Sequence, residues 1–114
     1  MMSSIPIVGG LLSDATEKTA TDDAEEGIAQ MLKRTGIHSY RYKDPAAPGA
    51  APGLHFGPMA QELEKSAVGK SLVHDTPQGK IVDTSRAAMV TMSAAASHEK
   101  RIAELEAIVN KGKR

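Results

Sequence analysis

"LHFGPMAQELEK", residues 54–65, joins an extended segment directly to a helix. "LHFG" predicts a short strand, and Pro58 suits the first position of a helix, where the missing N–H has no partner to lose. The following residues predict a helix through Lys65 whose apolar face carries Met59, Ala60 and Leu63. A strand followed at once by a helix indicates a mixed α and β domain.

The residues upstream predict a helix, a strand and a loop in succession. Asp22 and Asp23 can cap the helix, and Gly36 supplies its C-terminal stop. Acidic side chains in its first turn and basic ones in its last suit the helix dipole, and one face carries apolar residues: Ile28, Met31 and Leu32. "HSYRYK", residues 38–43, alternates as a half-buried strand does, and the proline- and glycine-rich residues 44–53 predict a surface loop.

The residues downstream predict a hairpin over residues 71–83. Thr76-Pro77-Gln78-Gly79 fits a type I turn, with proline second and glycine fourth. Leu72 and Val73 would then pair with Ile81 and Val82. The prediction is an α+β fold with a small antiparallel sheet and short helices.

A long helix is predicted from Asp83 or Thr84 nearly to the end of the chain, with no glycine or proline before Gly112. Ile102, Leu105 and Val109 have the spacing of a coiled-coil seam, which Ile108 widens. Projected backward, the seam passes small or polar residues: Ala88, Thr91, Ala95 and His98. Such a helix needs a partner to bury its apolar face. A parallel dimer, a parallel trimer and folding back onto the domain all fit this pattern.

The amino-acid composition restricts the classes of protein to which the chain can belong. The chain has 114 residues, enough for one small domain, and only 3% aromatics, so we expect oligomer contacts to complete its core. A net charge of zero argues against non-specific electrostatic binding to nucleic acid or to an anionic membrane. "IPIVGGLL", residues 5–12, is too short to span a bilayer and lacks the basic flank of a secretory signal, which predicts synthesis as a soluble cytoplasmic chain.

Neither a nucleotide site nor a metal site is predicted. "VGKS", residues 68–71, resembles the end of a phosphate-binding loop, but Glu64 stands where that loop needs its first glycine. The chain has no cysteine, and no two of its four histidines have the spacing of a helical metal pair. We therefore expect no metal and no cofactor.

Ser13 and Lys18 form the strongest chemical pair in the sequence. A lysine that loses its proton readily can take the proton of a serine hydroxyl and make it a nucleophile, and burial lowers the lysine pKa enough to allow this. From the residues alone, however, a serine followed by Asp14 is more typical of a turn or a helix cap.

Several stretches together resemble a known family. "SDATEK", "SYRYKDP", "HFGPMAQELEK", "GKIVDTSR" and "RIAELEAIV" occur in this order between about Leu12 and about Val109. This succession resembles the C-terminal intramolecular chaperone domain of bacteriophage tail fibres and tailspikes, of the endosialidase type. Its most specific piece is "GPMAQE", Gly57 to Glu62, preceded by "YRYKDP".

The resemblance implies a function. Such domains form homotrimers through a long C-terminal coiled coil, help a β-rich fibre to fold, and cleave themselves off just before a serine. Carried over, Ser13 is the nucleophile, Lys18 is the general base, and the scissile bond joins Leu12 to Ser13. Trimerisation falls to Ile102, Leu105 and Val109. The partners would be two further copies and tail proteins, in the virion tail or in the host cytoplasm during assembly.

The sequence also departs from the family pattern. The family usually has arginine and leucine before the lysine, where Thr16 and Glu17 stand here, and Glu17 could pair with Lys18 and keep it protonated. Thr84 replaces a tyrosine that commonly follows Val-Asp. Twelve residues precede Ser13, so the client is expected to be a separate chain, or this is one part of a longer chain, or the module stays uncleaved.

Three regions and three functions follow as expectations. Residues 1–12 would be an apolar N-terminal arm, residues 13–83 the chaperone-type domain, and residues 84–114 the oligomerising helix. The first function is trimerisation and assembly of a tail fibre, with self-cleavage. The alternatives are an uncleaved structural part of a phage tail, anchored by the arm, and a host-side oligomeric adaptor.

Overall fold

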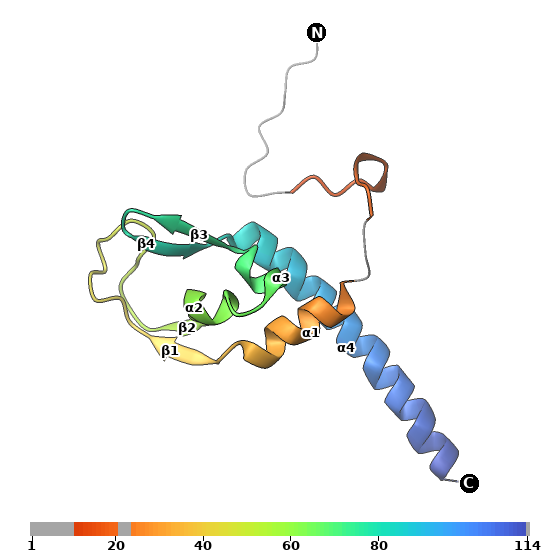
Figure 1. Ribbon diagram of the computed structural model, residues 1–114. Coiled ribbons are helices and arrows are strands. Elements are labelled where there is room, and N and C mark those ends of the chain that lie inside the picture. Colours follow the sequence, from red (N-terminus) through yellow and green to blue (C-terminus); the bar gives the residue numbers. More distant parts are fainter. Residues whose placement is uncertain (1–10, 21–23, 114) are drawn as a thin grey trace.

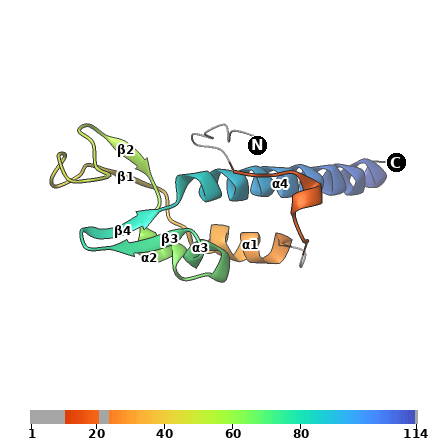
Figure 2. The same cartoon turned by 90° about the horizontal axis from the view of Figure 1, so that it is seen from above.

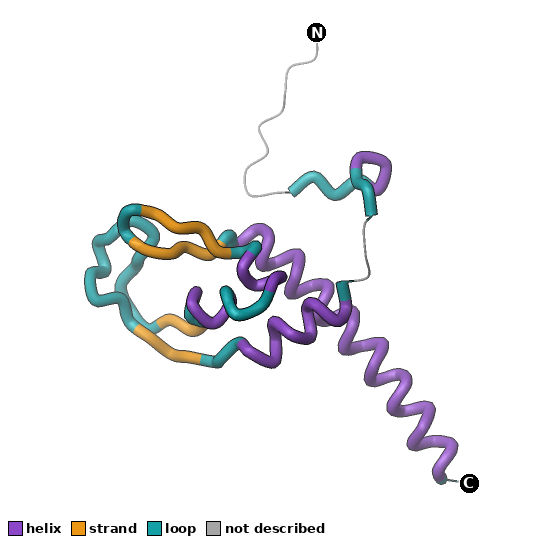
Figure 3. The backbone as a smooth tube through the Cα atoms, viewed as in Figure 1, coloured by secondary structure: helices purple, strands orange, loops and turns teal. Residues whose placement is uncertain are grey.

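The computed structural model describes residues 11–20 and 24–113 and has an extended shape. Its extents are 60 × 48 × 24 Å, with two hairpins at one end and a long helix leading away at the other (Figures 1 and 3). Most of the expected arm lies outside the described residues, as do Asp22 and Asp23, which were expected to cap the first α-helix. That helix, α1 (Glu25–Arg34), has Ala24 at its N-cap, with no side-chain hydrogen bond.

The first hairpin joins β1 (His38–Tyr40) to β2 (His55–Gly57). The strands are antiparallel, with Ser39 opposite Phe56. β1 is shorter than the strand predicted through Lys43, because its last residue, Tyr40, is paired with His55, the first residue of β2. The ring of Tyr42 meets His55 edge-on, with ring centres 5.1 Å apart, and also meets Tyr40 edge-on at 5.5 Å. The long loop therefore closes over a small aromatic cluster.

The helix predicted from Pro58 through Lys65 is shorter in the structure, and a second short helix that was not predicted follows it. These are α2 (Ala60–Leu63) and α3 (Ala67–Lys70). Pro58 lies outside α2, because Met59 is the extended N-cap residue and its N–H is bound by the Glu62 carboxylate at 3.2 Å. The backbone is extended at Ser66, the N-cap residue of α3. The Ser66 hydroxyl accepts a hydrogen bond from the Gly69 N–H at 3.1 Å. Residues 68–70 of "VGKS" thus belong to a capped helix.

Gly69 is required by close packing between these two helices. A Cβ at this position would overlap the backbone carbonyl of Leu63 and crowd the Ser66 hydroxyl. We expect Gly69→Ala to lower the free energy of unfolding by about 1–3 kcal/mol, a typical cost of overpacking. Urea unfolding measures this effect. Gly112→Ala is the matched control: a Cβ there meets nothing within 4 Å, so stability should be unchanged or slightly raised.

The second hairpin, β3 (Val73–Thr76) with β4 (Gly79–Val82), lies where the sequence predicted it. Val73 is opposite Val82, within the predicted pairing, whereas Ile81 is opposite His74. Leu72 precedes the strand, and its carbonyl accepts the Asp83 N–H at 2.7 Å. The two hairpins form two separate two-stranded sheets, so the single small sheet that was predicted is wrong in this detail.

The hydrophobic core is small and lies where the helices meet β3 and β4. Its buried centre is Met31 from α1, Leu63 from α2, and Leu72. Partly buried residues surround it: Val68, Val73, Val82, Ala87 and Val90. None of the aromatic side chains belongs to this cluster, and Phe56 is 74% exposed.

The long helix α4 (Thr84–Gly112) begins as predicted. Asp83 caps it by accepting the Arg86 N–H at 3.0 Å. Its N-terminal half packs beside α1, where Ala94 and Ser97 are buried. From His98 to Lys113 every residue is exposed, and this half projects away from the domain (Figures 1 and 2). The part of α4 from His98 on therefore does not fold back onto the domain, whereas the N-terminal half of the helix packs on it.

Candidate functional site

A single helical turn brings Ser13 and Lys18 together. The 3₁₀ turn η1 (Ala15–Glu17) is capped by Asp14, whose carboxylate accepts the Thr16 N–H at 2.9 Å and the Thr16 hydroxyl at 2.7 Å. The chain folds back over this turn, and Lys18 Nζ donates to Ser13 Oγ at 2.6 Å. Two side chains five residues apart in sequence are thereby in direct contact.

Asp14 and Thr16 are site residues that the sequence reasoning did not assign. The Thr16 backbone N–H, and then its hydroxyl, hold the pKa of Asp14 below its usual range. An ionised Asp14 is the stronger acceptor, so it favours the closed turn. The sequence held a weak signal, because aspartate side chains favour Asx turns, in which they bind the backbone two residues on.

The Glu17–Lys18 ion pair that the sequence allowed is not formed. Among the described residues, Lys18 makes its side-chain contact with Ser13 alone, and no ion pair joins it to Glu17. Residues 11–20 are all exposed, and Leu12, on the other side of the bond before Ser13, is 69% exposed. The geometry for proton transfer is therefore present, whereas the burial that makes a lysine an effective base is not supplied by the single chain.

Glu62, the last residue of "GPMAQE", joins three elements. Its Oε1 lies 2.7 Å from His38 Nε2 at the start of β1, and it also binds the N-terminus of α2. A Cβ on Gly36 would lie 2.5 Å from Glu62 Oε2, so this glycine allows the close approach. The Met59 N–H, opposed by partial burial and assisted by His38, lowers the pKa of Glu62. This part of the motif holds the first hairpin against α2.

Stability should depend on the charge of Glu62. Because its pKa is lower in the folded chain than the usual glutamate value of about 4.3, ionised Glu62 stabilises the fold above that pH. This contribution is lost as the pH falls through the folded pKa. We expect Glu62→Gln to be less stable than the unsubstituted chain in urea at pH 7, and the difference to vanish in acid. Glu104→Gln, on exposed α4, is the control, and a difference that persists in acid would contradict the prediction.

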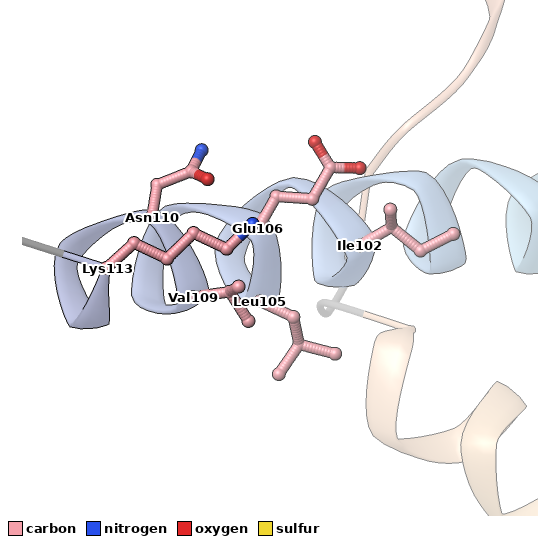
Figure 4. A pocket seen from close by; sticks show the side chains of 6 residues that line it. All are labelled: Ile102, Leu105, Glu106, Val109, Asn110 and Lys113. Atoms are coloured by element: carbon pink, nitrogen blue, oxygen red, sulfur yellow. The ribbon is translucent and has the colours of Figure 1, made fainter.

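The residues expected to mediate oligomerisation form one exposed apolar face of α4. Ile102 is 46% exposed, Leu105 61% and Val109 54%. They share one face of the helix, and Glu106 and Asn110 flank them on that face (Figure 4). Among the described residues this face has no partner, and in the sequence it begins at Ile102, well beyond the end of the second hairpin at Val82.

Two further findings concern only the part of the chain that the structure describes. Within residues 11–20 and 24–113, no group of three or more histidine, aspartate or glutamate side chains is arranged to hold a metal ion. Among the helices of these same segments, none is both long enough and apolar enough to cross a membrane.

Comparison with known proteins identifies the family. The family model described as chaperone of endosialidase matches residues 13–74, more than half of the chain. The search of curated proteins found no match to this chain. The chain therefore belongs to the family of endosialidase-type intramolecular chaperones, which is associated with phage tail fibre assembly and self-cleavage. The family resemblance inferred from the sequence motifs is confirmed.

Proposed function

We propose that this chain is a trimerisation and assembly module of a bacteriophage tail fibre or tailspike, and that it cleaves itself between Leu12 and Ser13. The observation that carries the proposal is the 2.6 Å contact between Lys18 Nζ and Ser13 Oγ. The family match begins at this same serine. A serine and a lysine in hydrogen-bond contact are the two groups that a Ser/Lys peptidase needs.

The cleavage can be written with these two residues. Neutral Lys18 takes the hydroxyl proton of Ser13, and Oγ attacks the carbonyl carbon of Leu12. The bond between this carbon and the Ser13 nitrogen breaks, leaving Leu12 as an ester on Oγ, and the lysine returns the proton to the freed amine. Water then hydrolyses the ester, which releases the segment through Leu12 and leaves a chain that begins at Ser13.

Exposure of residues 11–20 supports an order of events in this proposal. Within residues 11–20 and 24–113 of the single chain, no segment covers the Ser13–Lys18 pair, which is exposed to water. Association with neighbouring copies or with a client would supply the burial that favours a neutral lysine. Self-cleavage would thus follow assembly. A chaperone domain that is released by its own cleavage has to assist folding before that cleavage occurs.

Trimerisation is assigned to α4. Ile102, Leu105 and Val109 support it because they are apolar, regularly spaced and exposed. Isoleucine and valine alternating with leucine also suit two strands, so the number of copies rests on the family and on Ile108, which broadens the apolar face. In this proposal residues 13–83 are the chaperone-type domain and residues 84–114 the oligomerising helix, acting in the host cytoplasm during assembly or in the virion tail.

The intact mass of the purified protein tests the proposal. After long incubation at neutral to mildly alkaline pH, we expect the mass to fall by that of residues 1–12. An unchanged mass in a protein that is trimeric by sedimentation would contradict self-cleavage. It would favour the alternative, an uncleaved structural part of a phage tail.

A further inference from the structure

Two carboxylates stand close to Lys18 in the sequence, yet its amine binds the hydroxyl of Ser13. Asp14 lies four residues before Lys18, and Glu17 directly precedes it. An ammonium group favours an ionised acceptor, because Coulomb attraction adds to the hydrogen bond. Among residues 11–20 and 24–113, however, neither carboxylate forms an ion pair with Lys18, whose Nζ donates to Ser13 Oγ at 2.6 Å.

Thr16 holds one of these two carboxylates. Its hydroxyl donates to Asp14 Oδ1 at 2.7 Å, and its backbone N–H donates to the same oxygen at 2.9 Å. A backbone N–H would be present with almost any residue at this position, whereas the hydroxyl is supplied by threonine or serine. Thr16 stands where the family usually has arginine, so the hydroxyl contact is a feature of this chain.

An ion pair between Asp14 and Lys18 would oppose the proposed cleavage in two ways. It would take the amine away from Ser13 Oγ, and it would favour the charged form of the lysine, which accepts no proton. Residues 11–20 are exposed, so packing against other described elements does not fix the Asp14 side chain. The two hydrogen bonds from Thr16 fix it instead, at the N-cap of η1.

We propose that Thr16 is a positioning residue for self-cleavage, whose hydroxyl holds the Asp14 carboxylate and thereby leaves the Lys18 amine to Ser13. The inference rests on the proposed function and adds a residue that acts through another one. Thr16 withdraws a competing acceptor from the lysine. Its effect should therefore disappear when residue 14 carries no charge.

Thr16→Val tests this role, since it removes the hydroxyl but keeps the shape of the side chain and the backbone N–H. We expect self-cleavage at neutral pH to slow by about two- to fivefold, the effect of one exposed ion pair. The dependence of the rate on pH should move to higher pH, because a lysine paired with a carboxylate holds its proton more tightly. Thr16→Ser keeps the hydroxyl and should recover the lost rate. Thr19→Val removes a neighbouring exposed hydroxyl outside η1 and is the matched control.

Asp14→Asn separates this role from a merely structural one. Asparagine still accepts hydrogen bonds from Thr16, but it has no charge that attracts Lys18. In the Asp14→Asn background, Thr16→Val should therefore neither slow cleavage nor move its pH dependence. A slowing of the same size in both backgrounds would overturn the proposed role, because Thr16 would then act on the turn itself.

Trace acetylation with acetic anhydride measures the amine without relying on cleavage, since only neutral amines react. Mass spectrometry reads Lys18 in the peptide that still contains the Leu12–Ser13 bond, with exposed Lys43 as the internal reference. Thr16→Val should lower the labelling of Lys18 by about two- to fivefold. If the unsubstituted chain does not cleave but this labelling falls, only the self-cleavage is overturned, and Thr16 still directs the amine. Unchanged labelling in Thr16→Val would overturn the inference, whether or not the chain cleaves.

Discussion

Replacing Ser13 with alanine should abolish the release of residues 1–12. The substitution removes Oγ, the atom beside the Leu12–Ser13 bond that accepts the hydrogen bond of Lys18 Nζ. Loss of a nucleophile typically slows a peptidase by about four orders of magnitude or more. Lys18→Met, which keeps the length of the side chain but removes the amine, should slow cleavage by about 10²–10⁴-fold, the usual contribution of a general base. Intact mass and N-terminal sequencing follow both variants.

Ser39→Ala and Lys43→Met are the matched controls for these variants. Both residues are exposed and lie outside the 3₁₀ turn, so their cleavage rate should equal that of the unsubstituted chain. Release of the same fragment from the Ser13→Ala variant at the original rate would show that another protease, or another residue, makes the cut. Sedimentation of all four variants should be unchanged, because residues 11–20 lie apart from α4 in the fold (Figure 1).

Replacing Leu105 with aspartate should convert the protein to monomers. In the proposed oligomer, each copy contributes this leucine to the seam, and truncating a buried leucine costs about 2–5 kcal/mol. A carboxylate at the same place adds the cost of burying a charge. The domain itself should remain folded, because Leu105 is 61% exposed in the single chain and contributes nothing to its core. Analytical ultracentrifugation and circular dichroism measure the two effects separately.

Ala107→Asp introduces the same charge two residues away, on the side of α4 that faces away from the seam, and should leave the oligomer intact. If Leu105→Asp sediments like the unsubstituted chain, then α4 does not mediate self-association. The variant also tests the proposed order of events. If assembly supplies the burial that Lys18 needs, the monomeric variant should keep its full mass, although its Ser13–Lys18 contact is unaltered.

Local signals in the sequence predicted most elements correctly. The acidic and basic ends of α1, the Pro77-Gln78 turn and the uninterrupted run after Asp83 each depend on neighbouring residues. The second short helix, α3, was not predicted, because four residues carry too little periodicity to be recognised in a sequence. Its position depends on the close approach of Gly69 to the Leu63 carbonyl, which forms only when α2 and α3 pack. The strand end at Tyr40 likewise depends on His55, which lies far away in the sequence.

The sequence predicted which two residues form the candidate site, but it did not predict the contact between them. The position of Ser13 and Lys18 at the head of the family motifs identified them, and the sequence also suggested that Glu17 would take the lysine. The structure shows Lys18 on Ser13, because the Asp14–Thr16 hydrogen bonds close the turn in that direction. Propensities describe single residues and cannot rank two competing partners for one amine.

The sequence sufficed for the family, the mixed α and β class and the apolar stripe of α4, because motifs and periodicity are properties of the chain order itself. Two results required the folded chain. The hairpins remain two separate sheets, and Ala94 and Ser97 rather than Ala95 and His98 face the domain. Both depend on which surfaces meet across long sequence separations. On a helix, a shift of one residue changes the buried face by about 100°, so only the packing against α1 settles which stripe is left for other chains.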